Sequence, residues 1–464
     1  MQALIGIVQL TLKSAFRNRL ILFILIGLLG GVVALPALIQ HDETAKGFTQ
    51  IVLSYTLSFT VFLLGVVSLW VACWALARDI EESQIQMVAV KPIPRWKMWV
   101  GKWLGVMCVN AVCLGAAGLF VFFLLLWKSG ELPDQERTVL RNEVLVSRGI
   151  VTPDLPDMDQ MVEEEFQRRV AENNIPSTEW DAVRENLRET LDAQMQLVSP
   201  GFAKLWALDF RGLKERLKDE PLFLRANFQT AYALRNDEDP NYYPMVWVFG
   251  DPERPDRSQR PRELNASQWN TIEIPPGMIN DEGILHVEVR NYSRDSMLFP
   301  LGDSLEVLYR EGGFPLNFAR GLVILLCWLA LITTLGLTMS SFFSFPVAAF
   351  VSIAMLIIFF SGGLVDAVVE NNTVTSIDYN QDVPTRDYPV LDYIFMPFFH
   401  GLNWLIKLVT DFSPVESLSD GRSVSWFETF KAVVQIVFVA CGFLGAFGIY
   451  GLARRELARP QNMS

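Results

Sequence analysis

Charged side chains are missing from every long apolar run of this chain, although Asp, Glu, Lys and Arg make up 19% of its 464 residues. Each run approaches or exceeds the roughly 20 apolar residues that a helix needs to cross ~30 Å of hydrocarbon. A charge at the bilayer centre costs ~2.5–3.5 kcal/mol on insertion scales, so the charges that persist there usually mark ion or proton paths. Their absence argues against a proton- or sodium-coupled pump. The runs are Leu20–Leu38, Ile51–Ala77, Trp103–Trp127, Gly321–Phe343, Ala348–Val365 and Val433–Leu452.

Motifs for metal and nucleotide binding are missing as well. The histidines are limited to His41, His286 and His400, and all five cysteines lie within the apolar runs. No zinc-ligand spacing can be assembled from them. The sequence has neither G-x-S-x-G nor G-x-x-x-x-G-K-[ST]. We therefore expect a chain that is not itself an enzyme, holds no cofactor or metal, and has no ATP site of its own.

The negative charge belongs to one hydrophilic segment. Residues 128–316 hold 22 Lys and Arg against 35 Asp and Glu, whereas the rest of the chain holds 17 against 16. This acidic balance argues against nucleic acid as a partner. The segment contains no cysteine, so we expect it to fold without disulfides.

Basic residues beside the apolar runs predict the orientation. Lys13, Arg17 and Arg19 precede the first run, and the loop 78–102 between the second and third runs is also basic. The positive-inside rule places both in the cytoplasm. Six transmembrane helices then return the C-terminus to the cytoplasm and place the acidic segment outside.

The first 19 residues predict a helix that lies along the membrane surface. Gln9, Lys13 and Arg17 fall on one helical stripe, and apolar residues occupy the opposite face. Such a helix suits the interface before the first span. The alternative is that this segment is only the polar start of that span.

The acidic segment predicts an α+β domain inserted between the third and fourth transmembrane helices. In residues 133–218, apolar side chains recur every four positions, which predicts two amphipathic helices that pair as a hairpin. In residues 221–310, apolar and polar side chains alternate, which predicts a β-sandwich, with turns at Asp251–Arg262 and Pro275–Gly283. The helical positions are Met158, Val162, Phe166, Val170, Trp180, Val183, Leu187, Leu191 and Met195. The expected strands are Leu222–Phe228, Met245–Phe249, Trp269–Ile274, Leu285–Arg290 and Ser304–Tyr309.

Residues 367–427, between the fifth and sixth spans, contain the apolar run Ile394–Val409, which Asp392 and Asp411 flank. We interpret it as a re-entrant or interfacial helical pair in the outer leaflet. The alternative is a seventh span. Polar residues within the spans are candidates to line a pathway or to form helix–helix hydrogen bonds. These are Ser54, Ser58, Thr60 and Asn110.

The loop 78–102 contains the most informative pattern. An acidic pair precedes a small apolar stretch, a basic-Pro-x-x-Arg element follows, and Gly-Lys opens the next span. This order resembles the loop after the second span in permeases of the type-2 ABC transporter family. The matching residues are Glu81, Glu82, Lys91, Pro92, Arg95, Gly101 and Lys102. A further match is the tight hairpin Met339–Pro346 between the fourth and fifth spans.

The resemblance covers the six spans and the inner loops, and it does not cover the outer domain. It implies a permease subunit of a bacterial cytoplasmic (inner) membrane that docks a separate cytoplasmic ABC ATPase, where ATP-Mg would bind. A coupling helix in the loop 78–102 would contact that ATPase. The implied complex is a dimer with a second permease copy or a paralogue, in contact with membrane lipid. The alternative for the loop is contact with anionic lipid headgroups.

Three functions therefore remain open. The first is the permease of an ATP-driven exporter, and the second is a force-transmitting or scaffold complex through which no substrate passes. The third is a membrane-anchored sensor whose β-sandwich binds a glycan. The expected organisation is an interfacial helix (1–19), transmembrane helices 1–3 (20–127), the outer domain (128–316), transmembrane helices 4–5 (317–366), an outer loop (367–427), and transmembrane helix 6 with a cytoplasmic tail (428–464).

Overall fold

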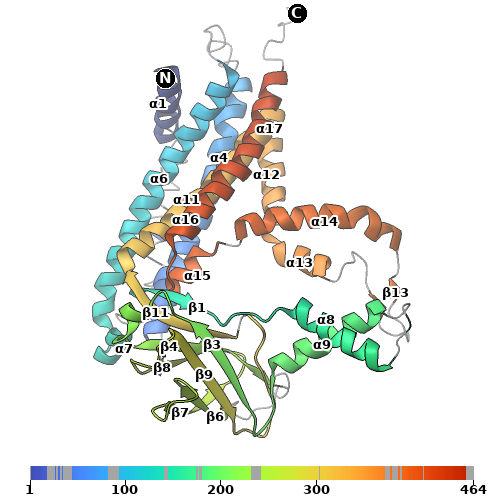
Figure 1. Cartoon of the computed structure of the whole chain (residues 1–464). Helices are drawn as coiled ribbons and strands as arrows, with labels where there is room; N and C mark the ends of the chain where they lie inside the picture. Colours follow the sequence, from blue (N-terminus) through green and yellow to red (C-terminus); the bar gives the residue numbers. More distant parts are fainter. Residues whose placement is uncertain are drawn as a thin grey trace, which may run out of the picture. The chain divides into compact units, whose positions relative to one another are not determined.

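The computed structural model divides the chain into two compact units (Figure 1). The membrane unit comprises residues 1–147 and 313–464, and the β unit comprises residues 148–312. The structure describes residues 2–17, 27, 30–31, 34, 44–81, 94–140, 145–173, 176, 180–230, 242–302, 304–370, 377–378, 385–386, 389–410 and 412–455.

Four helical stretches among the described residues are long and apolar enough to cross a membrane. The first stretch comprises α3 (Ala45–Thr49), η1 (Gln50–Tyr55) and α4 (Thr56–Glu81). The second is α6 (Arg95–Lys128), and the third is α11 (Phe314–Phe342). The fourth comprises α16 (Trp426–Ala432), η5 (Val433–Ala440) and α17 (Cys441–Arg454). The chain is thus a membrane protein that also contains a β domain.

The fifth predicted span is divided in two. Helix α12 (Phe345–Phe360) ends at Ser361, and α13 (Gly362–Glu370) follows. The expected continuous helix over Ala348–Val365 is therefore wrong. The interruption at Ser361 directly precedes Gly362 and Gly363, and glycine weakens a helix interior by ~1 kcal/mol. At 16 residues, α12 is about 24 Å long. The first predicted span, 20–38, lies mostly outside the described residues, so the count of six spans stays a prediction.

Helix α11 lies at the centre of the membrane unit. It packs against α4, α6, α12 and α17, and Leu329, Thr333 and Leu337 on it are completely buried. Helix α1 (Gln2–Arg17) packs against α6. In Figure 1, α1, the end of α4, the start of α6 and the end of α17 lie at the same end of the unit.

The outer-loop region contains two more helices, α14 (Pro389–Thr410) and α15 (Pro414–Ser419). Helix α14 packs against α13 and is drawn across the direction of α11 and α17 in Figure 1. It is not among the helices that are apolar enough to span, and this favours an interfacial helix over a seventh span. Strands β12 (Ile377–Asp378) and β13 (Thr385–Arg386) pair in the same region.

The β unit is a sandwich of two four-stranded sheets that share one hydrophobic core. Large side chains such as Trp247, Phe228 and Phe299 are fully buried in it. The first sheet has the order β1 (Val146–Val151), β11 (Leu305–Gly313), β4 (Leu222–Ala226) and β8 (Asn270–Ile274). The second has the order β3 (Ala203–Asp209), β9 (Ile284–Asn291), β6 (Tyr242–Phe249) and β7 (Ser258–Asn265). A smaller sheet joins β2 (Leu197–Val198), β10 (Met297–Leu298) and β5 (Gln229–Thr230).

Each expected strand corresponds to an observed one, but the two four-stranded sheets contain three strands that were not expected. The short strands β2, β5, β10, β12 and β13 were not expected either. Strands β1 and β3 lie in the region predicted to be helical, and β7 begins inside the predicted turn Asp251–Arg262. Strand β7 is an edge strand that contains Pro261 and is mostly exposed. An edge strand tolerates proline because one side of its backbone has no partner strand. The polar composition of β7 lacks the apolar alternation by which a strand is predicted.

The predicted helical hairpin is confirmed. Helices α8 (Met158–Asn173) and α9 (Trp180–Gln196) pack together around Val162, Phe166 and Leu187. The Phe166 and Trp180 rings meet edge to face, with their centroids 5.8 Å apart. The remaining short helices are η2 (Ser129–Glu131), α7 (Asp134–Val139) and α10 (Lys214–Leu217).

Candidate functional site at the start of α6

The structure places the matched loop residues in three settings. Glu82, Lys91 and Pro92 lie outside the described residues, as does the predicted coupling helix. Glu81 is the last residue of α4, and Arg95 is the first of α6. Gly101 and Lys102 also lie within α6. The predicted loop 78–102 is therefore shorter than expected, because helical hydrogen bonding extends beyond the apolar runs into residues at both of its ends.

Arg95 joins the start of α6 to the end of α17. Its Nη1 donates to the carbonyl oxygens of Leu452 at 2.9 Å and Arg455 at 3.3 Å, and also to that of Ala453. The last carbonyls of a helix have no intrahelical partner and are at the negative end of its dipole. A guanidinium satisfies both the hydrogen-bonding need and the charge. Arg95 is thus a structural C-terminal cap for α17.

Arg455 repeats this arrangement on the next helix. Its Nη1 donates to the carbonyl oxygens of Ser340 at 3.2 Å, Ser341 at 3.3 Å and Phe343 at 3.4 Å. These carbonyls belong to the end of α11 and to the residue after it. Because Arg95 also holds the backbone of Arg455, the two arginines connect α6 to α17 and α17 to α11.

Lys102 joins α6 to α4. Its Nζ forms an ion pair with the Asp79 carboxylate and donates to the Ala75 carbonyl oxygen. Only 7% of Lys102 is exposed. A buried ammonium requires a paired anion, because its desolvation is otherwise uncompensated. Lys102 was predicted to contact an ATPase. In the structure its charge is instead paired with Asp79 of the same chain.

Two glycines of α6 allow α1 to approach. A Cβ at Gly101 would lie 2.8 Å from Ile7 Cγ2, and a Cβ at Gly105 would lie 2.6 Å from Thr11 Cβ. Neither distance is compatible with a side chain. Small residues at this spacing let two helix backbones pack closely in a membrane. Gly101 is therefore a packing residue that seats α1.

The same part of α6 meets a second glycine face. A Cβ at Gly445 would lie 3.1 Å from the Trp99 ring, and a Cβ at Gly448 would lie 3.0 Å from Trp99 Nε1. Trp99 is buried. Sequence reasoning missed this face of α17, although glycines three residues apart in an apolar run were a signal for close helix packing. We call Arg95–Gly105 the α6 start, and it contacts α1, α4 and α17.

The polar residues within the spans divide into two groups. Asn110 Nδ2 donates to Thr333 Oγ1 at 3.2 Å, and Ser68 Oγ donates to Asn110 Oδ1 at 2.7 Å. Asn110 thus connects α6 to α11 and α4. The Thr60 hydroxyl donates to the Thr56 carbonyl oxygen of the same helix at 2.8 Å. For these two residues, the hydrogen-bond interpretation is the one that the structure supports.

Ser54 and Ser58 differ from that group. They line a polar cavity of about 450 Å³ together with Glu416 of α15 and with Asp420, the residue that follows this helix. Asp420 lies 3.8 Å from the Arg422 guanidinium. The cavity lies beside the π-helical segment η1, and π-helical turns occur frequently at functional sites. These two serines remain candidates for a pathway.

The β unit has its own charged cluster. Glu288 on β9 accepts hydrogen bonds from Arg257 at 2.5 Å and from Arg290 at 2.6 Å. Burial acts to raise the pKa of this carboxyl, but the hydrogen bonds from Arg290 and Arg257 outweigh it and lower the pKa below the usual 4.5. The cluster holds β9 against the residues that precede β7.

Comparison of the chain with family models, with curated proteins and with solved structures gave no match.

Proposed function

We propose that this chain is the membrane-spanning permease subunit of an ATP-driven exporter, and that it works with a separate cytoplasmic ATPase. The proposal begins from the resemblance of residues 81–102 to the coupling loop of type-2 ABC permeases. The observation that supports it best is the set of contacts at the α6 start. The helices on the two sides of the loop are joined, because Lys102 of α6 pairs with Asp79 of α4, and Arg95 of α6 donates to the end of α17.

A force applied to residues 82–93 would move the helices on both sides of the loop together. The Lys102–Asp79 ion pair keeps α4 and α6 together, and Arg95 connects α6 to the end of α17. Arg455 then connects α17 to α11. Rigid helices with fixed ends transmit rigid-body movement with little loss. This arrangement suits a subunit that is moved by a partner, and the sequence has no phosphate-binding loop of its own.

The decisive experiment compares two charge reversals in the loop. Glu81→Lys/Glu82→Lys should reduce recovery of the ATPase with the affinity-purified chain and lower ATP turnover, while leaving membrane insertion intact. A charge lost from a desolvated interface pair costs ~2–5 kcal/mol, whereas an exposed charge affects folding by only ~0–1 kcal/mol. Lys91→Glu/Lys97→Glu is the matched variant. If the loop contacts headgroups instead, only the lysine variant will change ATPase recovery and ATP turnover. Unchanged recovery and turnover in the glutamate variant would refute the proposal.

A second candidate is a force-transmitting complex through which no substrate passes. It is favoured by Asn110, Ser68 and Thr333, since these buried polar groups bond to one another between helices and do not face an open passage. Proteolysis of the β unit in the assembled complex distinguishes the two functions. Force transmission predicts that ATP changes the cleavage pattern in the absence of any added substrate, and an exporter predicts that the change requires substrate.

A further inference from the structure

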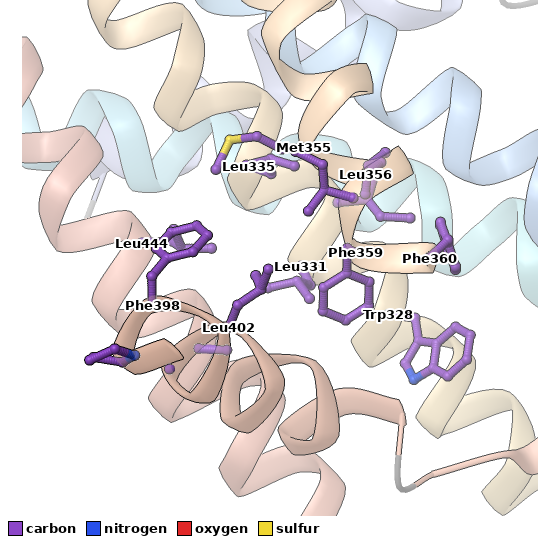
Figure 2. A pocket seen from close by; sticks show the side chains of 15 residues that line it. Trp328, Leu331, Leu335, Met355, Leu356, Phe359, Phe360, Phe398, Leu402 and Leu444 are labelled. Carbon is purple, nitrogen blue, oxygen red and sulfur yellow. The ribbon is translucent and has the colours of Figure 1, made fainter. Parts of the chain in front are cut away.

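An apolar cavity of about 510 Å³ lies among four helices of the membrane unit (Figure 2). Its walls come from α11, α12, α14 and the junction of η5 with α17. The lining side chains are all apolar except for the indole of Trp328. An engineered apolar cavity of ~150 Å³ stays dry and binds benzene. This cavity is more than three times larger, and it offers water almost no hydrogen-bonding partners.

Part of the cavity lining reaches the surface of the membrane unit. Several of its lining residues are also strongly exposed, including Ile358 at 50%, Phe360 at 65% and Phe398 at 63%. These residues lie on α12 and α14, at the surface of the unit. Helix α12 has no charged residue along Phe345–Phe360, and an apolar helix surface of this kind is suited to hydrocarbon. The exposed part of the lining is therefore suited to contact with lipid.

The cavity extends along α11. Its wall on this helix runs from Trp328 to Leu335, which corresponds to about 10 Å along a helix that rises 1.5 Å per residue. Figure 2 shows Trp328 and Phe360 towards one edge, with Leu335 and Met355 towards another. An apolar volume of this length accommodates part of a flexible hydrocarbon chain.

We propose that this cavity is a binding site for one acyl chain of a bilayer phospholipid. Because an acyl chain would move from one hydrocarbon medium to another, its gain comes from close contact of its methylenes with the lining side chains and not from removal from water. The bound chain would also pack beneath α14, so that α14 is held against α11 and α17 through a lipid. The proposal does not depend on the ATPase partner, and no residue of the α6 start takes part in it.

Gly401 on α14 provides a specific test. It lines the cavity, and a Cβ at this position meets no atom within 4 Å. Gly401→Leu therefore adds a side chain at the wall of the cavity without a clash at Cβ. Gly442 on α17 is the matched control, because it is also free of neighbours within 4 Å but lies outside the cavity on an exposed position.

The experiment uses the full chain in nanodiscs that contain phosphatidylcholine with a diazirine on one acyl chain. After irradiation, mass spectrometry maps the lipid adducts. We expect adducts in 328–335, 355–360 and 397–402 to exceed those at Leu119 and Phe123, which are exposed on α6. Gly401→Leu should reduce the cavity adducts at least about threefold, and Gly442→Leu should leave them unchanged.

Two results would overturn the proposal. One is equal labelling of the cavity and of Leu119 and Phe123. The other is labelling that Gly401→Leu does not reduce. If Gly401→Leu fails to elute as a folded protein, Leu402→Trp with Leu126→Trp as its exposed control replaces the pair, and the same threefold loss is required.

Discussion

Arg95, the first residue of α6, donates from Nη1 to the carbonyl oxygen of Leu452 in the last turn of α17 at 2.9 Å. These two residues are 357 positions apart in the sequence. The contact joins the helix that follows the candidate coupling loop to the helix at the other end of the chain. It therefore gives a physical route from the loop to most of the described spans.

Arg95→Gln should destabilise the membrane unit by ~1–3 kcal/mol, which is the range for hydrogen bonds to a charged donor. The reason is that the final carbonyls of α17 lose their cationic cap. Lys97→Gln, two residues away, is the control, since the Lys97 ammonium lies over the ring of its neighbour Trp96, 5.5 Å from the centroid, and this contact joins no two helices. Thermal unfolding in detergent, followed by size-exclusion chromatography, measures both. Equal melting temperatures for the two variants would contradict the cap.

Lys102→Met should destabilise the chain more than Arg95→Gln does. Removing one member of a buried ion pair costs ~3–5 kcal/mol, and the lower part of that range is expected because 33% of the Asp79 side chain is exposed. Adding Asp79→Asn should restore much of the loss, since no unpaired charge then remains. A double-mutant cycle on unfolding free energies tests this coupling. Additive losses would show that the two residues act independently.

Gly105→Leu should displace α1 from α6, because its Cβ would lie 2.6 Å from the Cβ of Thr11. Gly115→Leu on the same helix is the control, as a Cβ there meets nothing within 4 Å. Limited trypsin digestion after Lys13 reports the release of α1. Cleavage should be several-fold faster in Gly105→Leu than in Gly115→Leu. The same rate in both variants would show that α1 does not depend on this packing.

Residues 148–312, expressed alone, should fold and should not respond to reducing agent. This segment forms its own compact unit, and every cysteine of the chain lies outside it. Circular dichroism and a cooperative thermal transition, recorded with and without dithiothreitol, provide the measurement. A spectrum without strand and helix signals would contradict the independence of the β unit.

The stability of this isolated β unit should depend on the charge of Glu288. The pKa of Glu288 is lower in the folded than in the unfolded chain, so its contribution is fully present above an unfolded value of ~4.3. That contribution is lost as the pH falls through the folded pKa. Glu288→Gln should therefore lower stability at pH 7 and flatten the pH dependence below about pH 4.5. Urea unfolding at several pH values tests this, and parallel pH curves for both proteins would contradict it.

The elements that the sequence predicted correctly depend on local periodicity. Leu285, Val287 and Val289 alternate with polar residues, and β9 has that alternating burial. Val162, Phe166 and Leu187 recur at helical spacing and form the contact of the hairpin. A repeating apolar pattern commits a segment to one type of element because only that element places the pattern on one face.

The elements that it missed depend on partners distant in the chain. Pro261 lies in an edge strand because β6 pairs with β7, and nothing in the polar sequence 258–265 specifies that pairing. The break at Ser361 lies within an apolar run and was not predicted. Hydropathy indicates whether a segment lies in hydrocarbon or in water, and it does not indicate whether the helix is continuous. Local composition therefore gave no reliable signal at either place.

The candidate site shows the same division. The sequence alone determined that Arg95 and Lys102 belong to a charged loop that precedes an apolar helix, because charge and hydropathy are properties of single residues. Only the tertiary structure decided that Arg95 caps α17, that Lys102 pairs with Asp79 and that Gly401 faces a cavity. Such contacts arise from which helix ends and faces meet when the apolar surfaces pack, and that choice is made by the whole chain.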